Sequence, residues 1–85
     1  MKREDAIVML RIYEIQKTQG REVYSGDLAN ARVLPKNKCQ EKLEEFTSLG
    51  YLIESAERGA NKYRVSSLGY SQMIAYRDIK IEIGA

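Results

Sequence analysis

One segment of the chain, residues 34–50 (LPKNKCQEKLEEFTSLG), constrains the fold more than any other. Pro35 suits the first turn of a helix, because its missing N–H needs no partner there and its φ is already helical. Gly50 suits the left-handed position just past a helix end. Between them an apolar stripe recurs at helical spacing, formed by Cys39, Leu43, Phe46 and Leu49. The segment is therefore predicted to form a helix that is buried along one side.

The other side of this predicted helix is polar and basic over its first two turns. Its side chains there are Lys36, Asn37, Lys38, Gln40 and Lys42. A helix divided in this way has the shape and charge to enter the major groove of DNA. A solvated surface helix would show the same pattern, so this segment alone leaves both interpretations open.

Length and composition limit the classes of function. Eighty-five residues are enough for one small domain, 1–85, with a modest core. Fourteen basic residues against twelve acidic ones leave a net charge of +2, so any affinity for DNA must come from local clustering of charge. The single cysteine excludes an intrachain disulfide, and the absence of histidine removes the commonest metal ligand and general base.

The sequence also lacks a glycine-rich phosphate loop and an evident pair of catalytic carboxylates. We therefore expect no enzyme activity, no metal and no other cofactor. No stretch approaches the roughly 20 apolar residues of a membrane span, so we expect a cytoplasmic protein that does not bind membranes.

The segment before residue 34 is predicted to contain two helices. Residues 3–19 form an amphipathic pattern that is apolar over more than one face and is stopped by Gly20. A short extended run at 21–24 follows, and Ser25 is the predicted N-cap of a second helix over about 26–32. Helix, tight turn and helix of this length form a helix-turn-helix arrangement.

The segment after residue 50 is predicted to contain a hairpin and a last helix. Two β-prone runs, 51–57 and 62–66, are joined by residues 58–61, whose glycine and asparagine tolerate positive φ. Ser66 or Ser67 is the predicted cap of a helix from about residue 68. Residues 78–83 (DIKIEI) alternate strictly, and the pattern does not decide between a continued helix and an extended tail.

Two residue types have both a special and an ordinary interpretation. Cys39 would suit a redox switch, but its place on the apolar stripe favours packing in the core. The tyrosines would suit stacking on bases or on an aromatic ligand. Their spacing favours packing instead at Tyr13, Tyr51, Tyr63 and Tyr70.

The order of these elements resembles the winged helix-turn-helix domain of small prokaryotic transcriptional regulators, of the kind found in the MarR and PadR groups. Four local matches support the resemblance, namely YSGDLA at 24–29, LPKNKC at 34–39, LGYLI at 49–53 and YRVSSLG at 63–69. It covers nearly the whole chain. The implied fold is α+β and mainly α, with a three-helix core, a two-stranded β wing and a C-terminal helix.

The resemblance implies sequence-specific binding to double-stranded DNA by a transcriptional regulator. The recognition helix, about 35–49, would enter the major groove, and the wing, 51–66, would meet the backbone or the minor groove. The implied contacts are Lys36, Asn37, Lys38, Gln40 and Lys42 on the recognition helix, Arg58, Asn61, Lys62 and Arg64 on the wing, and Ser25 and Arg32 on the DNA backbone. The clustering of basic residues in both segments agrees with these places.

Glu41 argues in the other direction, because it puts a negative charge on the recognition helix. It would either accept a hydrogen bond from a cytosine amino group or indicate that this helix no longer meets DNA. The alternative function is therefore a winged-helix protein–protein interaction module within a larger complex, without DNA binding.

The apolar residues of the first and last helices exceed what so small a monomer usually buries. We therefore predict a homodimer formed through these two helices. Its predicted interface consists of Val8, Ile12, Ile15, Met73, Ile74 and Ile81.

Overall fold

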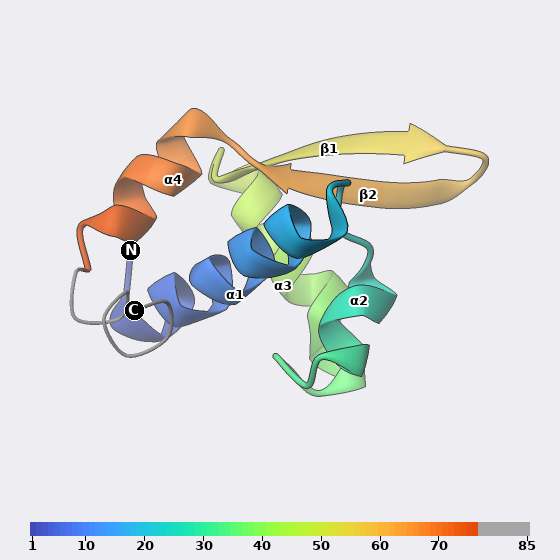
Figure 1. The fold of residues 1–85 in the computed structure, drawn as a ribbon, viewed down its shortest axis with the longest axis horizontal. Helices are drawn as coiled ribbons and strands as arrows, with labels where there is room; N and C mark the ends of the chain where they lie inside the picture. Colours follow the sequence, from blue (N-terminus) through green and yellow to red (C-terminus); the bar gives the residue numbers. More distant parts are fainter. Residues whose placement is uncertain (77–85) are drawn as a thin grey trace.

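The computed structural model describes residues 1–76, which form four helices and a two-stranded antiparallel sheet (Figure 1). The elements are α1 (Arg3–Gln19), α2 (Ser25–Asn30), α3 (Lys36–Ser48), β1 (Leu52–Glu57), β2 (Ala60–Val65) and α4 (Ser67–Ile74). In Figure 1, α1 passes in front of α3, and the hairpin extends away from the helices at one end of the molecule. This arrangement confirms the predicted winged-helix-like α+β fold. The predicted alternation at 78–83 lies outside the described residues.

Helix α1 runs through the middle of the fold and has the bounds predicted from the sequence. Gly20 ends it in the left-handed conformation, with φ of 69°, and donates its backbone N–H to the Gln16 carbonyl. Ala6, Met9 and Ile12 are completely buried in a core that also includes the buried side chains of α3 and the hairpin. Within residues 1–76, no helix combines the length and apolar content needed to cross a membrane.

Helix α2 begins at Ser25 and ends at Asn30, so it is shorter than the predicted span. Ser25 is not its N-cap, because Tyr24 occupies that position. The side chain of Asp27 reaches back to accept a hydrogen bond from the Tyr24 backbone N–H at 2.9 Å. This carboxylate satisfies the N–H of the cap residue itself, whereas the predicted Ser25 cap would satisfy an N–H two or three residues into the helix.

Helix α3 buries most of the predicted apolar stripe. Cys39, Leu43 and Phe46 are at most 1% exposed, which confirms that Cys39 packs in the core. Leu49 is 51% exposed, because the helix ends at Ser48 and the chain turns at Gly50 with φ of 82°. Pro35 is the N-cap rather than the first helical residue.

The hairpin turns over two residues, Arg58 and Gly59, instead of the predicted four. Both have left-handed backbones, with φ of 54° and 81°, as expected for a tight turn that matches the twist of the strands. Ala60 and Asn61 therefore belong to β2, where they pair with Glu57 and Ala56. The predicted extended run at 21–24 pairs with β2 at one point only, through an isolated antiparallel bridge between Val23 and Tyr63.

At the junction between the hairpin and α4, two backbone segments approach each other closely around Gly69. The Ser66 hydroxyl caps α4 by accepting from the Gly69 N–H at 3.0 Å and donates to the Gly50 carbonyl at 2.6 Å. Gly69 then faces Tyr51 so closely that an added Cβ would lie 2.2 Å from the Tyr51 carbonyl oxygen. Only glycine fits this position without a shift of the backbone.

We predict that Gly69→Ala lowers the free energy of unfolding by about 1–3 kcal/mol, because the new methyl group collides with the backbone at Tyr51. The control is Gly26→Ala in α2, where no atom lies within 4 Å of the added Cβ. It should raise the stability by about 0.5–1 kcal/mol through helix propensity. Urea unfolding of the two variants and the wild type measures both effects. Equal stability of Gly69→Ala and the wild type would contradict the close approach.

Candidate nucleic-acid interface

The first turn of α3 presents the side chains of Lys36, Asn37 and Lys38 to solvent, and we call these three residues the basic turn. Lys38 lies 3.7 Å from the carboxylate of Glu41, with both side chains more than half exposed. An ion pair this exposed contributes little stability and leaves the lysine available to another molecule. The structure thus brings together three of the five residues predicted on this helix.

The lysines of the basic turn lie at the end of the helix where its dipole disfavours positive charge. The N-terminus of a helix carries a partial positive charge, which favours acidic residues in the first turn. Helix α1 follows this preference, with Glu4 and Asp5 in its first turn and Lys17 in its last. Helix α3 has no acidic residue in its first turn and two lysines there. Local stability therefore does not explain these lysines.

Lys42 does not share the surface of the basic turn, so its predicted contact with DNA is not supported. Its ammonium nitrogen lies 3.3 Å from carboxylate oxygens of both Asp5 and Glu45 and 5.5 Å from the centre of the Phe46 ring. Burial by itself lowers the pKa of Lys42, but the two carboxylates outweigh it and raise that pKa. Lys42 borders the buried stripe and ties α3 to α1.

Gln40 borders the stripe on the opposite flank and contacts the hairpin. Its amide nitrogen donates to the Tyr63 hydroxyl at 2.8 Å. The same nitrogen lies 3.5 Å from a carboxylate oxygen of Glu44. Gln40 is thus exposed, but its amide nitrogen already contacts Tyr63 and Glu44. The periodicity of the sequence does not indicate these contacts.

The four predicted wing residues do not share one face of the hairpin. Side chains alternate along a strand, so Asn61 leaves β2 on the same face as Tyr63, which reaches α3. Lys62 and Arg64 leave on the other face, away from α3. Lys62 lies 3.8 Å from Glu22, which belongs to the connection before α2. Arg58 is exposed at the tip of the hairpin.

Of the two predicted backbone contacts, Arg32 has the better position. It is exposed, with a left-handed φ of 56°, in the turn that leads into α3. Ser25 lies half-buried at the start of α2. The exposed residues of the predicted set therefore include the basic turn on α3, Arg32 in the turn before it, and Asn61 and Arg58 toward the tip of the hairpin.

Two residues of the predicted dimer interface belong to the core of the monomer. Ile12 is completely buried and Met73 is 4% exposed within a single chain, so neither is available to a partner and the prediction is wrong for both. Val8 and Ile15 are half-buried against the same core. Ile74 is 40% exposed, and Ile81 lies outside the described residues.

The tyrosines predicted to pack against other residues do so. Tyr63 is completely buried, and the rings of Tyr51 and Phe46 lie 6.2 Å apart. The rings of Tyr13 and Tyr70 lie 5.3 Å apart between α1 and α4.

Burial raises the pKa of the Cys39 thiol, whose sulfur lies 3.4 Å from the Pro35 carbonyl oxygen.

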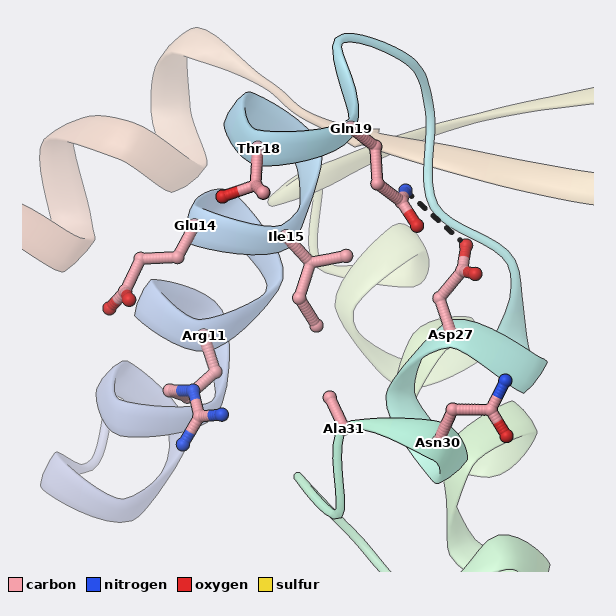
Figure 2. Close-up of a pocket in the computed structure, with 8 residues that line it drawn as sticks. All are labelled: Arg11, Glu14, Ile15, Thr18, Gln19, Asp27, Asn30 and Ala31. Atoms are coloured by element: carbon pink, nitrogen blue, oxygen red, sulfur yellow. Dashed lines mark hydrogen bonds between the residues drawn. The ribbon is translucent and has the colours of Figure 1, made fainter.

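A polar cleft of about 490 Å³ separates α1 from α2 (Figure 2). Ile15 points between the two helices, and Gln19 closes one end through a 3.5 Å contact with Asp27. Asp27 also pairs with Arg21 at 3.2 Å.

Within residues 1–76, no three His, Cys, Asp or Glu side chains are grouped so as to hold a metal ion.

A comparison with solved structures supports the fold. The chain superposes on the crystal structure of AF1382 from Archaeoglobus fulgidus with a TM-score of 0.74, over 100% of this chain and 92% of that chain. The two sequences are 15% identical, so the likeness concerns the fold alone. No protein-family model matches the chain, and no curated protein matches it at a significant level. The winged-helix fold permits DNA binding but does not by itself assign it.

We predict that Asp27→Asn removes a part of the stability that depends on pH. Burial by itself raises the pKa of Asp27, but the hydrogen bond from the Tyr24 N–H and the contact with Arg21 outweigh it and hold that pKa below its usual value. Because the pKa is lower in the folded state, this stabilisation is complete above about pH 5 and is lost as the pH falls through about 4 and below.

The free energy of unfolding should therefore fall by about 1–2 kcal/mol in Asp27→Asn at pH 7 and by less at pH 3. Urea unfolding at both pH values measures the difference. Glu41→Gln, at an exposed ion pair, is the control and should differ little from the wild type at pH 7. A deficit of Asp27→Asn that is equal at pH 7 and pH 3 would rule out the ionised carboxylate as its cause.

Proposed function

We propose that the protein is a double-stranded DNA-binding transcriptional regulator that acts as a homodimer in the cytoplasm, and that it is not an enzyme. The observation that carries the proposal is the basic turn, which puts two lysines and an asparagine on the exposed first turn of α3, at the end of a helix that disfavours cations. Residues that oppose local stability in this way are expected at functional sites.

The chemistry of the exposed residues suits a duplex. Lysine donates to guanine or pairs with phosphate, and the asparagine amide has the geometry to read adenine in the major groove. Arg32, in the turn before α3, and Arg58, at the hairpin tip, supply two further exposed cations. Contacts of this kind to phosphate fix the position of a protein on the duplex, whereas base contacts specify the sequence.

A homodimer is proposed because apolar side chains remain exposed on α4, with Tyr70 and Ile74 at 38% and 40%. Two copies would read half-sites about 34–36 Å apart, one turn of the duplex, on a pseudo-palindromic operator. The resemblance to the MarR and PadR groups is in line with this arrangement.

A protein–protein interaction module is the second candidate. It is favoured by three further apolar residues that are exposed, namely Leu49 after α3, Ile53 in β1 and Leu68 at the start of α4, at 51%, 41% and 48%. Glu41 and Glu44 on the exposed side of α3 point the same way, because they repel phosphate. The two candidates differ in their affinity for DNA and in how it depends on salt.

We predict that Lys36→Ala/Lys38→Ala weakens the binding of duplex DNA and lowers the slope of log K against log salt concentration by about 2, since each lost phosphate contact removes about 0.9. Fluorescence anisotropy of a labelled duplex between 50 and 200 mM salt (a range of about fourfold) measures both. Lys42→Ala is the matched control and should keep the wild-type slope, because Lys42 pairs with Asp5 and Glu45. The absence of any salt-dependent binding by the wild type would favour the interaction module instead.

We also predict opposite effects of Lys36→Glu on stability and on DNA binding. An acidic residue in the first turn of α3 should stabilise the fold by about 0.3–1 kcal/mol through the helix dipole. The same change should abolish measurable binding of duplex DNA at 150 mM salt (a Debye length of about 8 Å), because it places a negative charge against phosphate. Thermal unfolding and the anisotropy assay give the two results. Unchanged DNA affinity in a stabilised variant would remove Lys36 from the interface.

A further inference from the structure

Tyr63 joins three elements of the fold through its hydroxyl group. The residue lies in the middle of β2 and is completely buried, yet its hydroxyl reaches the boundary between the hairpin and α3. The hydroxyl accepts from the Gln40 amide nitrogen at 2.8 Å and donates to a carboxylate oxygen of Glu54 at 3.1 Å. We call these three residues the Gln40–Tyr63–Glu54 strut. It connects α3, β2 and β1.

The hydrogen-bond directions within the strut are fixed by chemistry. A carboxylate accepts only, so the single hydroxyl hydrogen of Tyr63 goes to Glu54. The hydroxyl must then accept from the other partner, which requires the amide nitrogen of Gln40 rather than its oxygen. Burial and the neighbouring Glu54 carboxylate raise the pKa of Tyr63, which keeps the hydroxyl protonated and able to donate.

The strut uses the side-chain amide of Gln40, which is the group that would contact a base. A bidentate contact with adenine uses the amide oxygen and one amide N–H together. One N–H of Gln40 is bonded to Tyr63, and the amide nitrogen also lies 3.5 Å from Glu44. Gln40 could offer the N–H that it gives to Tyr63 only by breaking that bond, and its second N–H lies beside the Glu44 carboxylate, so a bidentate contact with a base competes with both.

The geometry points to Tyr63 as a positioning residue for DNA recognition, which fixes the angle between α3 and the hairpin and withholds Gln40 from the bases. This inference rests on the proposed function. The basic turn and the hairpin tip must meet one duplex at the same time, so a change in the angle between them weakens the precise fit at a preferred site. Base reading is then restricted to the basic turn, and the electrostatic attraction to any duplex does not depend on the strut.

The test is Tyr63→Phe, which keeps the buried ring and every charge. We expect the affinity for the best duplex selected from a random pool to fall about tenfold. The affinity for unselected duplex and its salt slope should stay within about twofold of the wild type. The matched control, Tyr51→Phe, removes the hydroxyl of a tyrosine that packs on Phe46 and should leave both affinities unchanged. All measurements are made well below the unfolding temperature of each variant.

Gln40→Ala separates positioning from direct base reading. If Gln40 acts only through the strut, its loss matches that of Tyr63→Phe, and the double variant loses no more than either single one. A larger loss in Gln40→Ala, with relaxed preference at one base pair, would show that Gln40 reads that base and would overturn the inference.

The remaining outcomes also decide the question. Equal losses of Tyr63→Phe on selected and unselected duplex, or no loss on either, would overturn the positioning role and leave the proposed function in place. Failure of the wild type to bind any duplex would remove the proposed function and this inference with it.

Discussion

The burial of the apolar stripe of α3 decides which side chains of that helix can meet another molecule. Cys39, Leu43 and Phe46 are held against α1 and the hairpin with almost no exposure. At about 3.6 residues per turn, this orientation directs the two flanks of the stripe toward neighbouring elements. Lys42 therefore meets Asp5 of α1, and Gln40 meets Tyr63 of β2. The exposed side of the helix begins with the basic turn and continues with Glu41 and Glu44.

The charge along α3 consequently changes sign from its start to its end. Lysines stand in the first turn, where the helix dipole disfavours them, and exposed glutamates follow. A duplex placed along the whole helix would meet repulsion over its later turns. The proposed contact is therefore an end-on one, in which the start of α3, Arg32 and the hairpin tip touch the DNA and the strut holds them in a fixed relation.

Much of the fold could be predicted from the sequence because its signals are local. The bounds of α1 follow from its amphipathic pattern and Gly20, and the hairpin follows from two β-prone runs around a glycine. The details that were missed depend on one particular neighbour. Periodicity marks positions 40 and 42 as polar, but it does not indicate that Tyr63 and Asp5 lie beside them.

Errors in the turns and in the interface have similar causes. The serine at 25 has the usual chemistry of a cap, yet Tyr24 is the cap residue, and its N–H is satisfied by the carboxylate at 27. Arginine rarely adopts a left-handed backbone, so the two-residue turn at Arg58 was not expected. The prediction of Ile12 and Met73 at a dimer interface fails because the sequence does not show how much apolar surface one chain buries. The structure places both in its own core.

The most direct test of this account is the perturbation of backbone amide NMR signals when unlabelled duplex DNA is added to the isotope-labelled protein. We expect the largest changes at residues 36–38, with further changes at Arg32 and Arg58 and few in the buried part of α1. Changes confined to Leu49, Ile53 and Leu68, or no changes at low salt, would contradict it.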